Sequence, residues 1–246
     1  MKAEHGEELA RRDRGYWWFR TRYATVERSL RRTSAVPLRG LLDFGCGSGG
    51  FLRHAVDRGL VAASEAVGID GDPAAVARVR AMGFEAHQAD AASLPSLSLA
   101  NRPAAITALD VLEHVDDPVQ ALRSLRAMAA PEAAVVALVP ALPSLWSEWD
   151  DRLGHRRRYR AGSLRRDLEA GGWKVKQVRY LFCSMLVPAW VRSRVRAAAA
   201  RDEFPSVPRW LDAGLGFATT LESRFPWWPA GTSLCAIGVS EPQESE

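Results

Sequence analysis

One glycine-rich stretch, residues 41–52, constrains the fold more than any other part of this chain. It reads L-L-D-F-G-C-G-S-G-G-F-L: an apolar run ends in an acid and closely spaced glycines, and an apolar-periodic segment then continues to Gly59. This order predicts a strand, a tight turn and a helix. Glycines suit such a turn because a Cβ would block both the bend and the close approach of a ligand. Since a helix start offers free N–H groups, the stretch predicts a nucleotide-type binding loop.

The glycines fit two kinds of binding loop. Gly45, Gly47 and Gly50 match the G-x-G-x-x-G pattern of dinucleotide sites, whereas Gly45, Gly47 and Gly49 match the G-x-G-x-G pattern of S-adenosylmethionine enzymes. Asp43 favours the second kind, because a carboxylate there would repel a pyrophosphate but can orient the cationic amino-acid end of S-adenosylmethionine. The string L-L-D-F-G-C-G-S-G closely resembles motif I of class I S-adenosylmethionine-dependent methyltransferases.

Two later acids stand where strands are expected to end. Asp70 closes a strand over 66–70, where a carboxylate would accept two ribose hydroxyls, and this geometry serves NAD and S-adenosylmethionine equally. Asp90 follows a strand expected near 84–88 and resembles the family's acid that binds the adenine amino group, with Ala91 donating a backbone N–H to the ring. The competing interpretation of Asp90 is a solvated turn aspartate.

A second motif follows the strand expected over 104–109. The string D-V-L-E-H-V-D-D-P, residues 110–118, is very like motif IV of the same methyltransferases. The two motifs in this order and at this spacing are far more specific than either one alone. The resemblance covers residues 16–180 and implies a set of cofactor-binding residues in the core: Asp43, Gly45, Cys46, Gly47, Gly49, Asp70, Gly71, Asp90, Ala91, Asp110 and Val111.

Four consecutive aromatic residues, 16–19, precede the glycine loop in a segment that looks helical. They cannot all lie on one helix face, so some must cap a neighbouring surface or pocket. A helix packed on the core and a lid over the cofactor are both open interpretations. A similar cluster with nearby arginines precedes motif I in a subgroup of bacterial methyltransferases, where it closes the cofactor pocket. The resemblance implies that Trp18 covers the pocket and that Arg22 meets the cofactor carboxylate.

The alternation of strands and helices predicts an α/β fold with a doubly wound, Rossmann-like sheet, and the resemblance implies seven strands with an antiparallel last strand. The expected parts are a helical lid (1–35), the cofactor-binding core (36–180), a helical insertion (181–230), the final core strand (231–240) and a tail (241–246). The insertion departs from the family, which usually joins its last two strands by a short hairpin. A cover for a bulky acceptor is the preferred role, ahead of a dimer surface or an interfacial membrane helix.

Two histidines lie in loops expected to face the binding crevice, namely His114 and His155. Either is a candidate general base for a hydroxyl acceptor, and His155 is preferred because His114 has a simpler structural role in the fourth-strand turn. Together with Asp110 and Glu113 they also resemble the metal constellation of small-RNA 2′-O-methyltransferases. Glu-His at this point occurs in relatives that need no metal, so the sequence assigns no metal ligand.

The composition is that of an ordinary globular protein, with 47% hydrophobic and 25% charged residues. A net charge of +4 is too small to indicate nucleic acid, and no RNA-binding module accompanies the arginines of 152–166. Three cysteines without a C-x-x-C pair favour a reducing compartment, and no signal peptide is visible. We expect a cytoplasmic protein without a transmembrane segment, with a homodimer and a peripheral membrane contact through 181–230 as open alternatives.

The resemblance predicts methyl transfer from S-adenosyl-L-methionine to a small-molecule acceptor, with O-methylation of a hydrophobic or aromatic metabolite preferred. N- or C-methylation of a metabolite or a lipid-linked sugar is the first alternative. An NAD-dependent oxidoreductase and a non-catalytic cofactor-binding partner subunit are the rivals from other classes.

Overall fold

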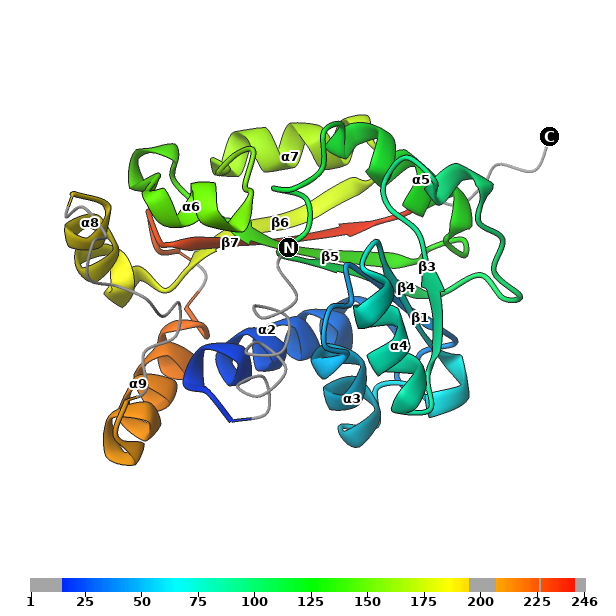
Figure 1. The fold of residues 1–246 in the computed structure, drawn as a ribbon, viewed down its shortest axis with the longest axis horizontal. Coiled ribbons are helices and arrows are strands. Elements are labelled where there is room, and N and C mark those ends of the chain that lie inside the picture. The colour runs from blue at the N-terminus through cyan, green and yellow to red at the C-terminus, as the bar shows by residue number, and fades with distance from the viewer. Residues whose placement is uncertain (1–14, 195–206, 226, 242–246) are drawn as a thin grey trace.

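A seven-stranded sheet with the order β3-β2-β1-β4-β5-β7-β6 forms the centre of the protein (Figure 1). The computed structural model describes residues 15–194, 207–225 and 227–241. The strands are β1 (Leu41–Phe44), β2 (Ala66–Asp70), β3 (Glu85–Gln88), β4 (Ala105–Leu109), β5 (Ala134–Pro140), β6 (Lys174–Leu181) and β7 (Ser233–Val239). The first five strands pair in parallel, and β7 lies antiparallel between β5 and β6. The predicted doubly wound sheet with an antiparallel last strand is confirmed.

Helices cover both faces of the sheet (Figure 1). The described helices are α2 (Trp17–Thr33), α3 (Gly50–Asp57), α4 (Pro73–Ala81), α5 (Pro118–Met128), α6 (Glu148–Leu153), α7 (Ala161–Ala170), α8 (Leu186–Arg194) and α9 (Arg209–Glu222). Helices α2, α3 and α4 lie on one face, and α5 and α7 on the other. The central strands are buried on both sides, as the near-continuous apolar run of β5 requires.

The start of each helix follows from its sequence. Asp72 and Asp117 accept hydrogen bonds from the backbone N–H groups of Ala74 and Gln120, and a proline then occupies the first position of α4 and of α5. Because of these caps, α4 and α5 begin soon after the strands that precede them. The carboxyl ends of β1, β2 and β4 therefore face one shared crevice.

Helix α2 is both a core helix and a pocket wall. Val26 and Leu30 are fully buried beneath the sheet, whereas the aromatic residues of its first turn line the cavity described below. The start of the helix therefore lines the cavity, and its later part packs on the core. Residues 1–14 of the expected lid, part of the expected insertion (195–206) and 242–246 of the expected tail lie outside the described residues.

Helix α9 of the insertion packs along α2. The hydroxyls of Thr21 and Thr219 lie 2.9 Å apart, and the Arg20 guanidinium makes a 2.7 Å ion pair with Asp212. Ser223 extends the contact, since its backbone oxygen accepts a 2.7 Å hydrogen bond from the buried Arg179 of β6. Helix α9 is therefore fixed to the core. Within the described residues, no helix has the length and apolarity that crossing a bilayer requires.

Candidate active site

The glycine loop bends sharply between β1 and α3. Gly45 has a φ of +76° and donates a 2.7 Å hydrogen bond to the carbonyl oxygen of Ile69. A Cβ on Gly45 would stand 2.7 Å from Val111, which belongs to the loop after β4. The loop thus passes too close to its neighbour for any residue larger than glycine.

Four backbone N–H groups of this loop are already used inside the protein. Gly47 donates a 2.8 Å hydrogen bond to Asp70 Oδ2, Gly45 and Cys46 donate to Ile69, and Gly49 donates to the carbonyl oxygen of Cys46. A pyrophosphate would need such donors free. The loop therefore fits a nucleoside with a cationic end better than it fits a dinucleotide.

A cavity of about 1120 Å³ opens beside the loop. This volume exceeds the range of roughly 300–1,000 Å³ typical of a single small-molecule site, so it has room for a cofactor and an acceptor together. Every residue expected at the site lines the cavity except Gly49. A Cβ on Gly49 would lie 3.0 Å from Val79, so this glycine serves the packing of α3 against α4.

Carboxylates line the part of the cavity next to the glycine loop. Asp43 is buried and accepts a 2.6 Å hydrogen bond from the Thr107 hydroxyl. Asp70 closes the glycine loop through Gly47, yet each of its oxygens has a second lone pair that a ribose hydroxyl can use. Asp90 is bound by the Ser93 hydroxyl and backbone, which lowers its pKa, and it is exposed, as the solvated-turn interpretation requires.

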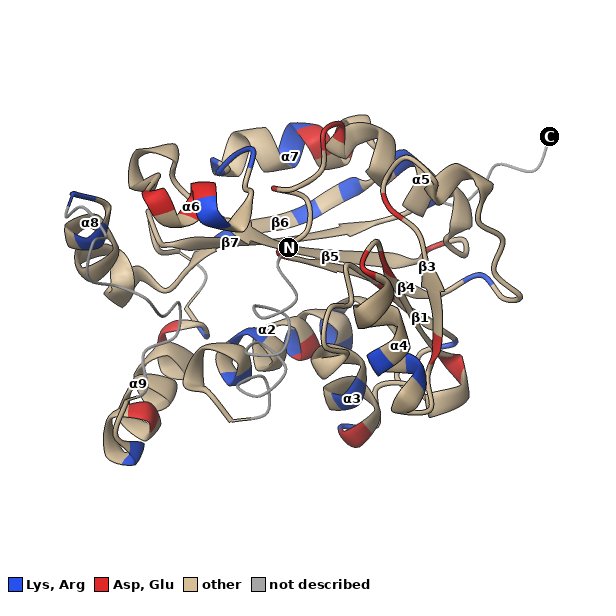
Figure 2. Cartoon of the chain, viewed as in Figure 1, with Lys and Arg blue, Asp and Glu red and all other residues tan. Residues whose placement is uncertain are grey.

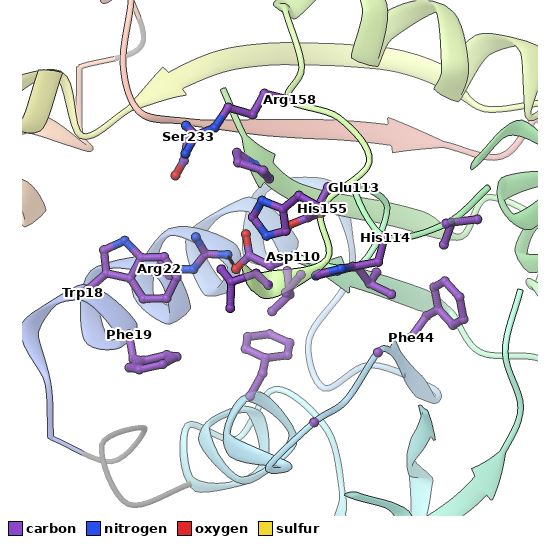
Figure 3. Close-up of a pocket in the computed structure, with 18 of the residues that line it drawn as sticks. Trp18, Phe19, Arg22, Phe44, Asp110, Glu113, His114, His155, Arg158 and Ser233 are labelled. Atoms are coloured by element: carbon purple, nitrogen blue, oxygen red, sulfur yellow. Dashed lines mark hydrogen bonds and ion pairs between the residues drawn. The ribbon is translucent and has the colours of Figure 1, made fainter. Parts of the chain in front are cut away.

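Trp18, Arg22 and Asp110 form one unit on the α2 side of the cavity (Figure 3). The Arg22 guanidinium lies 3.9 Å from the centre of the Trp18 ring and makes an ion pair with Asp110. Trp18 in turn stacks on Phe182, the residue that follows β6. Arg22 was expected to meet the cofactor carboxylate, and in this structure its partner is Asp110.

The Nδ1 atom of His155 contacts a buried carboxylate. Its Nδ1 lies 2.8 Å from Asp150 Oδ1, and Arg158 donates to both oxygens of the same carboxylate at 2.7 and 3.0 Å. Burial alone would raise the pKa of Asp150, but the hydrogen bonds from His155 and Arg158 outweigh it and hold that pKa far below its usual value. When His155 is neutral, the ionised Asp150 favours the tautomer with the proton on Nδ1, so that Nε2 is the acceptor nitrogen of the ring.

His114 and Glu113 complete the cluster on this side of the cavity (Figure 3). The two histidine rings meet edge to face with their centres 4.8 Å apart. Burial, followed by the charge of His155, lowers the pKa of His114 to about 4, so His114 is neutral near pH 7. Burial also raises the pKa of Glu113 to about 7, and its Oε2 has no hydrogen-bond partner among the described residues.

Glu113, His114 and His155 offer ligand atoms that all lie within 4.8 Å of one another, a spacing compatible with a metal ion. Asp110, the fourth member of the resemblance set, is engaged by Arg22 instead. Arg22 and Arg158 also lie close enough to Glu113 to lower its pKa, so two guanidinium charges would oppose a dication there. The cluster suits proton transfer better than metal binding.

Glu113→Gln should make the stability of the fold less dependent on pH. The folded-state pKa of Glu113 is raised from 4.5 to about 7, so its ionisation destabilises the native protein progressively as the pH rises through this interval. In urea titrations, the free energy of unfolding of the variant minus that of the wild type should be larger at pH 8 than at pH 5, by on the order of 1–3 kcal/mol. Glu65→Gln, at an exposed position, is the control. Parallel pH profiles for wild type and Glu113→Gln would refute the raised pKa.

The key residue that sequence reasoning missed is Asp150, the carboxylate behind His155. The sequence indicates only one role for Asp150, which follows from its position three residues after Ser147. It caps the start of α6 by accepting hydrogen bonds from the backbone N–H and the hydroxyl of Ser147. That position accounts for a helix start only. The contacts with His155 and Arg158 depend on the return of the chain after α6.

The sheet order and the glycine loop are those of the class I methyltransferase fold. The chain belongs to the methyltransferase family, because the family model described as a methyltransferase domain matches residues 16–178, more than half of the sequence. A comparison with curated proteins finds no match.

Solved structures share the fold at low sequence identity. One comes from the complex of the Trm112 methyltransferase activator of Haloferax volcanii with a methyltransferase (17% identity, TM-score 0.63, 97% of this chain and 95% of that chain). A second is the N-methyltransferase NodS of Bradyrhizobium japonicum with S-adenosyl-L-homocysteine (15%, 0.57, 96% and 97%). A third is the [4+2]-cyclase SpnF (18%, 0.59, 93% and 86%). Because the fold also carries a cyclase, the likeness does not identify the acceptor.

Proposed function

We propose that this chain transfers the methyl group of S-adenosyl-L-methionine to a hydroxyl oxygen of a hydrophobic or aromatic small molecule, with His155 as the general base. The observation that carries the proposal is the imidazole held on the cavity wall by the buried, ionised Asp150. Transfer to a hydroxyl needs a group that takes the proton as the oxygen becomes a nucleophile. We assign that role to Nε2 of His155.

The cofactor would lie along the glycine loop, where it supplies an electrophilic methyl group. Asp70 would accept the ribose hydroxyls, and Asp43 would orient the amino-acid end. Gly45, Cys46, Gly47, Gly71, Ala91 and Val111 would form the contact surface along the nucleoside, with Asp90 at the adenine edge. Trp18 and Arg22 would cover this half of the cavity and exclude water.

The acceptor would lie between the histidine cluster and the insertion. This part of the wall is mainly apolar, with Leu145, Trp149, Met185, Val207 and Leu215 on it. Apolar walls favour a hydrophobic acceptor, and water exclusion strengthens the attack of a weak oxygen nucleophile. His114 would assist by holding the acceptor hydroxyl or by serving as the second proton acceptor.

His155→Gln should lower kcat by about 10²–10⁴-fold while leaving the affinity for S-adenosyl-L-homocysteine unchanged. The physical reason is that glutamine can hydrogen-bond the acceptor hydroxyl but cannot take its proton at neutral pH. Release of S-adenosyl-L-homocysteine with a panel of phenols and alcohols measures kcat, and calorimetry measures the affinity. His87→Gln, on the edge strand β3, is the matched control.

The same assay separates the alternatives. Unchanged kcat in His155→Gln would exclude the base and favour a nitrogen or carbon acceptor that needs none. A loss of wild-type activity on exhaustive chelation, restored by a divalent cation, would move the role of Glu113, His114 and His155 to metal binding. Retained cofactor affinity with no transfer to any acceptor would favour the non-catalytic partner subunit.

A further inference from the structure

All the large hydrophobic side chains that are exposed in the described part of the chain lie between residues 187 and 227. We call this set the apolar end; it consists of Val187, Trp190, Val191, Trp210, Phe217, Leu221, Phe225 and Trp227. Trp210, Phe217 and Trp227 are each more than 70% exposed. Figure 1 shows their helices, α8 and α9, at the same end of the molecule. Soluble surfaces scatter such residues singly, so this gathering indicates an interaction surface.

Helix α8 and the turn before it carry two stripes with different surroundings, each made of three apolar residues and an arginine. One stripe, at positions 185, 188, 189 and 192, lines the cavity. The other, at positions 187, 190, 191 and 194, faces away from it and is exposed. Each stripe has the i, i+3, i+4, i+7 spacing of one helix face. The cavity explains the first stripe, and nothing among the described residues covers the second.

Helix α9 repeats this division. Positions 212, 216, 219 and 223 run along the face that packs on α2. Positions 210, 214, 217 and 221 form another face, which is exposed and consists of Trp, Gly, Phe and Leu. A solvent-facing helix surface normally carries charged residues there. The exposed face of α9 is therefore a second apolar face at the same end of the molecule as α8.

Among the described residues of α8, of α9 and of the turn after α9, the exposed charged side chains are arginines. Arg194, Arg209 and Arg224 are exposed, and Figure 2 shows the basic segments on α8 and at one end of α9. The acids of α9 are engaged inward: Asp212 pairs with Arg20, and Glu222 binds the backbone N–H and hydroxyl of Ser184. Aromatic residues ringed by arginines complement a surface with an apolar interior and anionic headgroups.

The position of the cavity distinguishes a bilayer from a protein partner. Pro188 and Arg192 line the cavity and are themselves exposed, so the cavity reaches the surface next to the apolar end. A protein bound over this end would close that route. A bilayer would leave it open to any molecule that moves laterally within the lipid.

We propose that the apolar end docks onto a lipid bilayer that carries anionic headgroups. If the chain transfers methyl groups as proposed above, its acceptor is then an amphiphile that partitions into the bilayer and enters beside α8. The docking itself does not rest on the proposed function. It requires only the exposed aromatic residues and the arginines around them.

Vesicle flotation of the full chain tests the docking without cofactor or acceptor. Vesicles of phosphatidylcholine with about 30% phosphatidylglycerol should bind the chain, pure phosphatidylcholine should bind it much less, and salt near 0.5 M should weaken binding. Trp210→Ala with Phe217→Ala should weaken binding at least about tenfold. Both side chains are mostly exposed, so this variant should keep the wild-type melting temperature.

A charge variant and its matched control complete the test. Arg194→Gln with Arg224→Gln should lower binding to the anionic vesicles, whereas Arg102→Gln with Lys176→Gln, exposed elsewhere on the protein, should not. Failure of the wild type to bind either vesicle, or wild-type binding by the aromatic variant, would overturn the proposal. So would a dimer in light scattering that the aromatic variant dissociates, because the apolar end would then be an interface between copies.

The acceptor class has its own test, with radiolabelled S-adenosyl-L-methionine and vesicles made from lipids of the encoding organism. Label in the organic phase after extraction is expected. Label confined to water-soluble products would overturn the amphiphilic acceptor while leaving the docking result intact. Absence of label in both phases, with cofactor binding retained, would count against the proposed methyl transfer as well.

Discussion

Replacing Asp150 by asparagine should destabilise the protein by about 3–5 kcal/mol, the usual cost of removing one partner from a buried ion pair. The Asp150 carboxylate is fully buried and accepts hydrogen bonds from His155, Arg158 and Ser147. An amide has the same size, but its NH₂ group would face one of these donors, and the Arg158 charge would be left without its counterion. Chemical denaturation and the melting temperature measure the loss.

The same substitution should remove most of the activity that remains at a temperature where the variant is folded. An amide N–H directed at Nδ1 of His155 would stabilise the tautomer with the proton on Nε2. In this tautomer Nε2 is already protonated, so it cannot take the proton of the acceptor. Glu148→Gln, in the same helix but exposed, should change the stability by less than about 0.5 kcal/mol. If Asp150→Asn unfolds no more easily than Glu148→Gln, the buried pair does not support the site.

Gly45→Ala should weaken cofactor binding by more than about 100-fold. The φ of +76° strains any L side chain by about 1–2 kcal/mol, and the new Cβ would also stand 2.7 Å from Val111. The loop or the motif after β4 would have to move, and both line the cavity. Calorimetry with S-adenosyl-L-homocysteine measures the effect.

Gly59→Ala separates strain from close approach in this experiment. Gly59 also has a positive φ, +63°, but a Cβ there would meet nothing within 4 Å. Its replacement should lower the stability slightly and leave cofactor affinity at the wild-type value. Equal losses of affinity in both variants would show that the contact with Val111 is not what shapes the loop.

The sheet was predictable from the sequence because its signals are local. The apolar runs of β1, β2, β4 and β5 end in acids or proline, and the helices after β2 and β4 begin with Asp-Pro. Few sheet topologies are compatible with parallel strands that are linked by helices in this way. The antiparallel orientation of β7 was predicted from family resemblance, whereas its place between β5 and β6 was not predicted, because no residue of that strand indicates its neighbours.

The lining of the cavity was more predictable than the contacts between its residues. Asp43, Asp70, Asp110, His114 and His155 all line the cavity, as expected. Their partners depend on residues far apart in the chain. The Asp110 carboxylate is engaged by Arg22, which lies 88 positions earlier in the chain, and this pairing has no signature in either motif.

The roles of the single glycines in the loop were also not predictable from the motif. The pattern of the loop treats Gly45, Gly47 and Gly49 alike, yet only the first two line the cavity. Gly49 is required by its positive φ and by the packing of α4 against the loop. Which glycine faces a ligand depends on the direction of the chain after the turn.

Calorimetric titration of the purified protein with S-adenosyl-L-homocysteine and, separately, with NADH tests the central claim most directly. We expect the first to bind at one site per chain and NADH not to bind, because the loop N–H groups are already donated and carboxylates line the cavity. Asp70→Ala should weaken the first interaction at least about tenfold, since Asp70 closes the loop and would accept the ribose hydroxyls. Binding of NADH without binding of S-adenosyl-L-homocysteine would contradict the account.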